Sequence, residues 1–319
     1  MKLLVINSAL KDQHRKMIEE TAKKTGVSLC FVSSEDEAPK DFAEPDIIYG
    51  FGVKTASSSM KLKWLCVPSA GVDFLMKEDA FANRDCLLTN SAGAYGVSIA
   101  EHIIAVSIMM MRHITDHVLL SKNGEWGTPV PQRSLKDSRI TVLGTGDIGC
   151  SFAKRARAFE PRSITGVNRS GMCEEPLYDR VMSVDRLDEV LPETDLLVMS
   201  LPDTALTRGI MSGERLGLLS KDSYIVNVGR GSAIDEDALA DLLDRGELAG
   251  AALDVFRCEP LPKDSRLWKT KNLLITPHVA GNLTLDHTID RNVEMFCEDL
   301  ENFAAGRPLK YTVDRKLGY

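Results

Sequence analysis

The chain has 319 residues, which is long for a single hydrophobic core and predicts two domains. Its composition, 44% hydrophobic and 27% charged, is typical of a soluble globular protein and excludes a disordered one. The formal net charge of −7, without any basic run, argues against a nucleic-acid-binding surface.

Neither the apolar segments nor the cysteines indicate a membrane protein or an oxidising compartment. The apolar run at Met1–Asn7 is short and no small-residue cleavage site follows it, so it reads as a strand and not as a secretory signal. The most apolar helical stretch, about Ile99 to Met111, carries charge and is too short to span a bilayer. Seven cysteines stand without CxxC spacing, which fits free thiols in a reducing cytosol. We expect a cytoplasmic protein with no membrane span, disulfide or structural zinc.

In the first ninety residues, short apolar runs alternate with helical or loop stretches. Continuous apolar runs separated by crossovers are typical of parallel strands that are covered on both faces. Five strands are expected here, at Leu3–Ile6, Leu29–Val32, Ile47–Tyr49, Trp64–Val67 and Leu87–Thr89.

A helix from about Ser98 to Arg112 comes next and connects two α/β domains in this interpretation. After a Gly- and Pro-rich surface loop at Gly124–Ser134, the same alternation resumes. Seven strands are expected in this half, at Ile140–Leu143, Ile164–Val167, Val181–Val184, Leu196–Met199, Tyr224–Val228, Ala251–Val255 and Leu273–Thr276. Parallel neighbours need crossover connections, so the sequence predicts an α/β protein with two doubly wound parallel-sheet domains.

The last predicted element is an amphipathic helix at about Leu285 to Ala305, which we expect to return to the first domain. The first domain is then discontinuous and consists of residues 1–96 and 289–319. The second domain consists of residues 97–288.

A glycine-rich turn follows the first strand of the second domain and opens a helix. Its six residues have the G-x-G-x-x-G pattern: Gly144, Thr145, Gly146, Asp147, Ile148 and Gly149. In this pattern the first glycine makes the tight turn, the second admits a pyrophosphate, and the third lets helix and strand pack closely. The pyrophosphate binds the free amides of the helix N-terminus. Because strand and helix flank the turn, the second domain is predicted to be a dinucleotide-binding Rossmann domain.

The choice between NAD(H) and NADP(H) depends on the residues that end the next strand. An acidic residue there usually binds the ribose hydroxyls of NAD. This chain has Asn168, Arg169 and Ser170 instead, so no carboxylate repels a 2′-phosphate, and Arg169 is able to pair with one. The alternative is that Arg169 is only a solvated loop charge. We favour NADP(H) over NAD(H).

Three reactive side chains follow strands of the second domain, where ligands bind in open α/β sheets. They are Arg230, Glu259 and His278. Reduction of a 2-keto acid needs a cation for the carboxylate, which suits Arg230, and a proton donor for the carbonyl oxygen, which suits His278. A carboxylate beside a histidine fixes its tautomer, which suits Glu259. The cofactor itself performs the redox chemistry.

At these residues the sequence resembles the D-isomer-specific 2-hydroxyacid dehydrogenase family, which includes glyoxylate and hydroxypyruvate reductases. The resemblance covers nearly the whole chain. It rests on the glycine turn and on further blocks at 69–73, 100–102, 227–231, 253–256, 259–260 and 276–278.

The resemblance implies a flavodoxin-like substrate domain beside the Rossmann domain, and a homodimer. It implies that Arg230, Glu259 and His278 are the catalytic set, and that Asp254 holds the nicotinamide carboxamide. The substrate carboxylate is then bound by backbone amides of Ala70, Gly71 and Val72, together with Arg230 and His278. Further cofactor contacts are expected along the strand ends, at Leu201, Pro202, Thr207, Val228, Gly229, Arg230, His278 and Gly281.

Some positions depart from the family pattern or leave the substrate open. Asn168 replaces the usual acidic residue, as in NADP-using members, and the stretch Phe159, Glu160 and Pro161 stands where members commonly have a glycine. The pocket positions do not identify a particular acid; they are Phe51, Tyr95, Trp268 and Asn282.

Other interpretations compete with the enzyme. A corepressor-like protein that senses NAD(H) shares this fold and similar motifs. Formate oxidation is disfavoured, because the extended N-terminal segments of that branch are not recognised here. His113 and His117 have i, i+4 spacing but no third ligand, so we expect a solvated helix end and no metal site. His102 is expected to satisfy a polar contact and not to catalyse.

Overall fold

The computed structural model describes residues 1–173 and 176–318, and the chain divides into two compact units. Unit 1 consists of residues 1–95 and the segment from Asn282 to the end of the chain, and unit 2 of residues 96–281. The return to unit 1 therefore lies at Asn282, earlier than the predicted residue 289. The reason is that Leu283, which precedes the last helix, already packs against the core of unit 1.

Unit 1 is built around a five-stranded sheet with the order β2-β1-β3-β4-β5, in which all neighbours are parallel. The unit contains β1 (Lys2–Ile6), α1 (Asp12–Thr25), β2 (Ser28–Val32), β3 (Ile47–Gly50), α2 (Val53–Ser58), β4 (Trp64–Cys66), β5 (Leu87–Thr89) and α9 (Asp286–Ala304). Every strand expected in this half is present, although β4 ends one residue before Val67.

The two faces of this sheet are covered by segments from both ends of the chain. Strand side chains alternate between faces. Leu3 and Val5 therefore pack with α1 and with Val293 and Phe296 of α9, whereas Leu4 and Ile6 pack on the opposite face. Because α9 supplies buried residues to this core, unit 1 needs the C-terminal segment to close its sheet.

Unit 2 holds a seven-stranded sheet with the order β12-β11-β10-β9-β6-β7-β8, also parallel throughout. Its elements are α3 (Gly96–Met111), α4 (Ile114–Lys122), β6 (Arg139–Leu143), α5 (Asp147–Ala156), β7 (Ser163–Asn168), β8 (Arg180–Ser183), α6 (Leu187–Val190), β9 (Leu196–Met199), α7 (Gly213–Leu216), β10 (Tyr224–Asn227), α8 (Glu236–Arg245), β11 (Gly250–Leu253) and β12 (Leu273–Ile275). The order reverses between β6 and β9, so the sheet is doubly wound.

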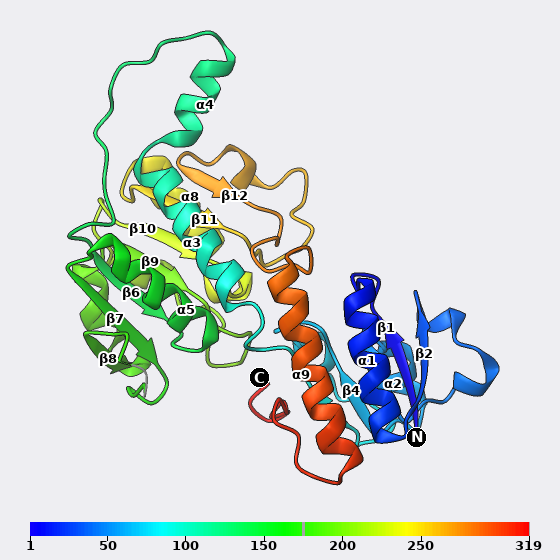
Figure 1. The fold of residues 1–319 in the computed structure, drawn as a ribbon. Coiled ribbons are helices and arrows are strands. Elements are labelled where there is room, and N and C mark those ends of the chain that lie inside the picture. The colour runs from blue at the N-terminus through cyan, green and yellow to red at the C-terminus, as the bar shows by residue number, and fades with distance from the viewer. Residues whose placement is uncertain (174–175, 319) are drawn as a thin grey trace. The chain divides into compact units, whose positions relative to one another are not determined.

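Helices cover both faces of the sheet of unit 2. Leu239 and Leu243 of α8 pack in one core with alternate strand residues, and α3 and α5 lie on the other side (Figure 1). All seven strands run the same way, so their carboxyl ends share one edge. That edge carries the glycine turn, Asn168, Arg230, Asp254 and His278.

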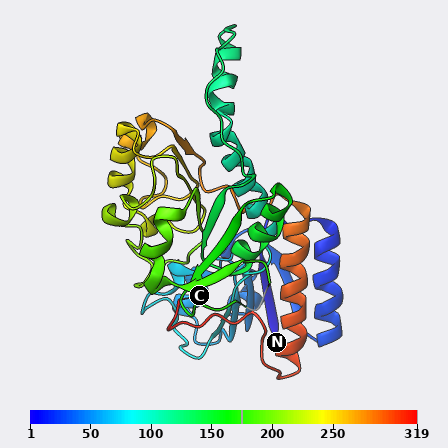
Figure 2. The ribbon, with the colours of Figure 1, turned by 90° about the vertical axis from the view of Figure 1, so that its left-hand side faces the viewer.

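The helix α4 stands away from the body of unit 2 (Figures 1 and 2). His113 takes a left-handed conformation (φ 53°) and separates α4 from α3, and none of the residues of α4 is buried. No single helix in residues 1–173 and 176–318 is long and apolar enough to cross a bilayer. The pair α3 and α4 passes that test of length and composition together, with a 67° bend between them.

Candidate active site

The glycine turn after β6 has the geometry that its pattern predicts. Gly144 adopts φ 104°, which a side chain would strain, and its amide donates to the carbonyl of Val167. A Cβ at Gly149 would overlap the carbonyl oxygen of Gly144, so glycine is required where α5 crosses β6. A Cβ at Gly146, the N-cap of α5, would meet nothing within 4 Å. The space beside Gly146 and the N-terminus of α5 therefore fit a dinucleotide pyrophosphate.

The loop after β7 is held by the amide group of Asn168. The Nδ2 atom of Asn168 donates to Thr145 Oγ1 and to the Met172 carbonyl, both at 2.7 Å. Its Oδ1 atom accepts from the Gly171 amide (2.7 Å) and from Ser170 Oγ (3.2 Å). Asn168 thus connects this loop to the glycine turn, and its side chain makes its hydrogen bonds to groups within the protein. Arg169 is exposed.

The loop after β9 contains an acidic residue that the sequence analysis missed. Asp203 Oδ1 accepts from Ser232 Oγ and from Arg208 Nε, both at 2.8 Å. Hydrogen bonds from Arg208 hold the pKa of Asp203 below its usual value against the opposing effect of burial, and the charge of Arg230 adds to the lowering. Asp203 therefore lies near the predicted catalytic arginine. The hydroxyl of Thr207 donates to the Pro202 carbonyl and so shapes this loop.

Arg230 follows β10 in a tightly packed segment. A Cβ at Gly229 would lie 2.6 Å from backbone atoms of Leu201, and one at Gly231 would overlap the backbone of Phe256. Asn227 bridges the turn, because its Oδ1 accepts from the Gly229 amide and its Nδ2 donates to the Arg230 carbonyl. The glycines on both sides of Arg230 thus let its backbone enter between the loops after β9 and β11.

His278 and Glu259 form a hydrogen-bonded pair at the same edge. The distance between His278 Nδ1 and Glu259 Oε2 is 2.6 Å, and Glu259 Oε1 accepts from the Phe256 amide at 2.9 Å. A carboxylate only accepts, so Nδ1 carries the proton and Nε2 is the ring atom left for exchange. The side chains are 48% and 34% exposed, which leaves the imidazole accessible to a ligand.

Asp254 directly follows β11 and is 2% exposed. Its carboxylate accepts hydrogen bonds from Thr276 Oγ1 (2.6 Å), the Val279 amide (2.9 Å) and the Ala280 amide (3.0 Å). The predicted role of Asp254 toward the nicotinamide carboxamide stays a prediction. The observed hydrogen bonds give the carboxylate a role within the protein, which is to hold the loop that carries His278.

In unit 1, the predicted carboxylate-binding block follows β4. Ser69 Oγ donates to the Gly71 carbonyl (2.8 Å), and Asn90 Nδ2 donates to the Ala70 carbonyl (2.6 Å). Among the acceptors in the described part of the chain, none is bonded to the backbone amides of Ala70, Gly71 or Val72. These amides are therefore available to an anionic ligand.

The four positions that were expected near the substrate differ in character. Phe51 is 49% exposed and packs against Phe74, with 6.1 Å between ring centroids, beside a hollow of about 440 Å³ at the carboxyl ends of β1–β4. Tyr95 is buried and donates to the Pro68 carbonyl. Trp268 is half exposed and donates to the Pro262 carbonyl at 2.8 Å, and Asn282 Oδ1 accepts from the Thr284 amide. Phe51 therefore borders a cavity of unit 1.

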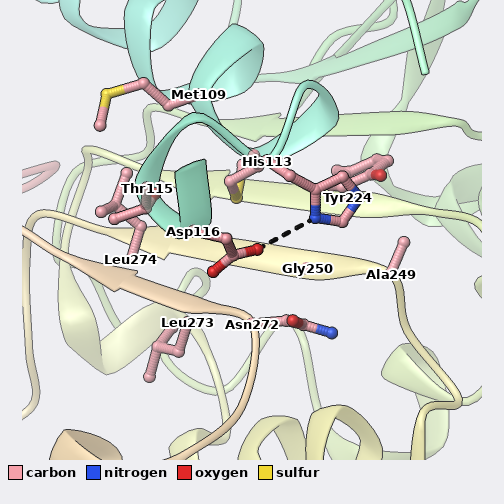
Figure 3. A pocket seen from close by; sticks show the side chains of 11 residues that line it. Met109, His113, Thr115, Asp116, Tyr224, Ala249, Gly250, Asn272, Leu273 and Leu274 are labelled. Atoms are coloured by element: carbon pink, nitrogen blue, oxygen red, sulfur yellow. Dashed lines mark hydrogen bonds and ion pairs between the residues drawn. The ribbon is translucent and has the colours of Figure 1, made fainter. Parts of the chain in front are cut away.

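A second hollow, of about 140 Å³, lies at the amino ends of β10–β12, opposite to the catalytic edge. Figure 3 shows His113 above it, paired with Asp116 at 3.2 Å, and Asn272 on the far side. No group of three or more His, Cys, Asp or Glu residues that could hold a metal occurs within residues 1–173 and 176–318. The side chain of His113 therefore contacts one carboxylate, that of Asp116, whereas a metal site would need further ligands.

Comparison with known proteins decides the family. Residues 104–280 match the family model described as "D-isomer specific 2-hydroxyacid dehydrogenase, NAD binding domain". The chain belongs to this family. Unit 2 is therefore its NAD(P)-binding domain, and the chain is an NAD(P)-dependent 2-hydroxyacid oxidoreductase by family.

Individual relatives agree with this assignment. Glyoxylate/hydroxypyruvate reductase A from Salmonella paratyphi C is 29% identical over 81% of this chain and 82% of its own length. A D-isomer-specific 2-hydroxyacid dehydrogenase family protein from Aeromonas salmonicida is 30% identical with a TM-score of 0.87, covering 98% of this chain and 99% of the other. An NADPH-dependent glyoxylate/hydroxypyruvate reductase from Sinorhizobium meliloti, solved with NADP and sulfate, is 25% identical with a TM-score of 0.80 and covers 100% and 99%. Both domains of the predicted architecture are matched in these structures.

Proposed function

We propose that this member of the family reduces a small 2-keto acid, such as glyoxylate or hydroxypyruvate, to the D-2-hydroxy acid with NADP(H). The observation that carries the proposal is the His278–Glu259 pair at 2.6 Å, at the sheet edge that also bears the glycine turn. The names of the Salmonella and Sinorhizobium relatives support the choice of substrates.

His278 is the proton donor in this mechanism. A reduced nicotinamide, when bound, would supply a hydride to the carbonyl carbon, so the carbonyl oxygen would need a proton. In the doubly protonated ring, Nδ1–H donates to Glu259, which fixes the ring, and Nε2–H gives its proton to the substrate oxygen and leaves the ring neutral. Glu259 keeps its orientation because the Phe256 amide holds its second oxygen.

The substrate carboxylate is bound by fixed charges and amides. Arg230 offers a planar, permanently charged guanidinium, which suits a carboxylate and the adjoining carbonyl. The amides of Ala70, Gly71 and Val72, for which residues 1–173 and 176–318 provide no acceptor, suit the same group. A carboxylate held by donors of either kind fixes the orientation of the adjoining carbonyl for reduction.

Arg169 supports NADP(H) as the cofactor. Asn168 uses its amide to hold its own loop, so the exposed guanidinium of Arg169 is the group at this strand end that suits a 2′-phosphate. The absence of a carboxylate at 168–170 removes the repulsion that NADP would meet in an NAD-specific site.

Turnover is tested by following the absorbance of NADPH and of NADH with glyoxylate, hydroxypyruvate, pyruvate and bulkier 2-keto acids. Bulkier acids belong in the panel because of the hollow beside Phe51. We expect reduction of at least one small acid with NADPH. No turnover with any of them would refute the enzymatic proposal, and tight cofactor binding without turnover would favour the corepressor-like alternative.

The cofactor preference is tested with Arg169→Ala. Loss of one charge-assisted contact predicts an increase in KM for NADPH of about ten-fold, with little change for NADH. Arg162→Ala is a matched control, because Arg162 is an exposed arginine at the opposite end of the same strand. Equal or better use of NADH by the unchanged protein would show that Arg169 does not select the cofactor.

The catalytic role of His278 is tested with His278→Ala. We expect turnover to be lost while the dissociation constant for NADPH changes by less than about three-fold, because the cofactor binds mainly through the glycine turn. The exposed His287 on α9 provides the control variant His287→Ala. Loss of cofactor binding in His278→Ala would mean that His278 is structural.

We further propose that the protein is a homodimer that is held together by α4. Exposed apolar side chains on this projecting helix and the loop after it support the proposal: Val118 is 46%, Leu119 57% and Trp126 101% exposed. Exposed aromatic and apolar clusters of this kind mark protein interfaces. We take a second copy of the chain as the partner of this surface, because a second copy is present wherever the protein is made.

A further inference from the structure

One buried carboxylate, that of Asp254, accepts hydrogen bonds from the loop that carries His278. Three donors of this loop converge on Asp254: the Thr276 hydroxyl on the near side of His278, and the Val279 and Ala280 amides on the far side. The amide of His278 itself donates to the Asp254 carbonyl at 2.8 Å. The backbone is thus fixed both before and after the imidazole.

This fixation matters because His278 is in a strained conformation. Its φ is 52°, in the left-handed region, which is uncommon for a residue other than glycine. Strain of this kind persists only where surrounding contacts over-determine the backbone. If the contacts weaken, the imidazole loses its fixed position relative to Glu259.

One further side chain extends this network, and it comes from a different element. His102, on α3, has its Nε2 atom 3.3 Å from Thr276 Oγ1. The hydroxyl proton of Thr276 goes to Asp254, because a carboxylate cannot donate and the 2.6 Å distance is that of a charge-assisted bond. Thr276 Oγ1 must then accept from His102, so Nε2 carries the hydrogen. Burial lowers the pKa of His102 despite the opposing charge of Asp254, which keeps the ring neutral with a single N–H.

We propose that His102 is a positioning residue for the reduction of 2-keto acids: its Nε2–H holds the Thr276 hydroxyl on Asp254, and this chain fixes the backbone of His278. The inference rests on the proposed function for its kinetic consequence only. His102 touches neither substrate nor cofactor in this scheme and acts through Thr276.

The tautomer of His102 is the direct test; it needs no substrate, and a variant serves only to assign the ring. Nitrogen-15 spectra of the histidine-labelled, unchanged protein at neutral pH report which ring nitrogen is protonated. We expect the Nε2–H form for the ring that disappears from the spectrum in His102→Gln. A predominant Nδ1–H form would overturn the proposal, because Nε2 could not then donate to Thr276.

Variants test the consequence for catalysis. His102→Leu and Thr276→Val each remove one hydrogen bond of the chain and should lower kcat about three- to ten-fold, with the dissociation constant for NADPH within about two-fold. His102→Gln places an amide N–H near the position of Nε2, and Thr276→Ser keeps the hydroxyl, so both should restore kcat to within about two-fold. The double variant His102→Leu/Thr276→Val should be no slower than the slower single variant, because the two residues act in series.

A matched control separates positioning from general destabilisation. Thr141→Val removes a buried hydroxyl pair with Thr194 inside the same sheet, far from His278 in the strand order, and should leave kcat unchanged. If His102→Leu keeps the kcat of the unchanged protein, or if the two losses multiply in the double variant, the proposal is wrong.

Failure of the proposed function has a different signature. A chain that turns over no 2-keto acid would refute the function, and the tautomer of His102 and the ring resonances of His278 would still report on the network. His102→Leu and Thr276→Val should both move the nitrogen-15 resonances of the His278 ring, whereas Thr141→Val should not. Unchanged His278 ring resonances in both variants would overturn the inference even in an active enzyme.

Discussion

The first and third glycines of a dinucleotide-binding turn are required for structure, and the second for the ligand, and this chain allows the two roles to be separated. Gly149→Ala and Gly146→Ala add the same methyl group three residues apart. At Gly149 the added Cβ would overlap the carbonyl oxygen of Gly144 and lie 3.1 Å from Val142 Cγ1. At Gly146 it would meet nothing within 4 Å, and the backbone there (φ −78°, ψ −162°) suits any residue.

The expected effects on stability differ accordingly. A backbone carbonyl cannot move aside as a flexible side chain can, so Gly149→Ala should cost about 2–3 kcal/mol, the upper part of the range for overpacking. In a unit of this size that lowers the melting temperature by about 4–12 °C. Gly146→Ala should leave the melting temperature of the apo protein unchanged or raise it slightly, since alanine restricts the unfolded chain.

The effects on cofactor binding are reversed for Gly146. Its open side is where the pyrophosphate approaches the amides of α5, so a methyl group there should weaken NADPH binding by at least about ten-fold through loss of one charge-assisted hydrogen bond. Thermal unfolding with and without NADPH measures both quantities in one assay. Undiminished NADPH affinity in Gly146→Ala, or an unchanged melting temperature in Gly149→Ala, would refute this account of the turn.

Three further predictions follow from contacts away from the glycine turn. Although burial opposes it, hydrogen bonds from Arg139 at 2.7, 2.8 and 3.1 Å hold the pKa of Asp195 below its usual value. This stabilisation is complete above about pH 4 and is lost as the pH falls below it, so acid unfolding of Asp195→Asn should be less steep than that of the unchanged protein. Leu119→Ser combined with Trp126→Ser should shift the protein from dimer to monomer in analytical ultracentrifugation without lowering its helix content, and a monomeric unchanged protein would contradict the proposed role of α4. Glu160→Gly should raise the free energy of unfolding by about 0.5–1 kcal/mol, because Glu160 has φ 53° and its ion pair with Lys136 is exposed; a loss of stability would show that the ion pair outweighs the strain.

Apolar patterning located the strands of both sheets, but it placed some strand ends too late. The sequence predicted strands through Val228, Val255 and Thr276, whereas pairing ends at Asn227, Leu253 and Ile275. The chain leaves the sheet early because side chains take over the backbone hydrogen bonds, as Asn227 does with the Gly229 amide. A hydrophobicity pattern does not show whether a side chain or a neighbouring strand bonds a backbone group. These strand ends are also where the loops with the candidate residues begin.

The candidate residues could be predicted from their positions after strands, whereas the contacts that hold them could not. Glu259 could be nominated as the partner of His278 because both follow neighbouring strands. The role of Asn168 within its loop and the proximity of Asp203 to Arg230 depend on loop conformations that leave no periodic signal. Asp203 could have been suspected from its place directly after β9, at the same edge as the other candidates.

Glu160 gives a physical reason for one departure from the family pattern. The position has φ 53°, a conformation in which glycine is unstrained, and it ends the turn between α5 and β7. A glycine is therefore expected at this place on conformational grounds, and this chain carries a glutamate there with an ion pair to Lys136. The position lies before β7, at the opposite end of the strand from Asn168.

Backbone strain in unit 2 also distinguishes ordinary turns from the carboxyl edge of the sheet, which carries His278. Five non-glycine residues among those described have positive φ. Asp137 and Asn272 precede strands at the amino-terminal edge and belong to the residue types that tolerate this conformation. Glu160 lies at that edge too, with an exposed ion pair. His278 differs, because it lies at the carboxyl edge and its neighbours in the chain are bonded to a carboxylate that is 2% exposed. A buried network of that kind is unnecessary for a turn, so its presence around His278 argues that the imidazole is held in place for chemistry.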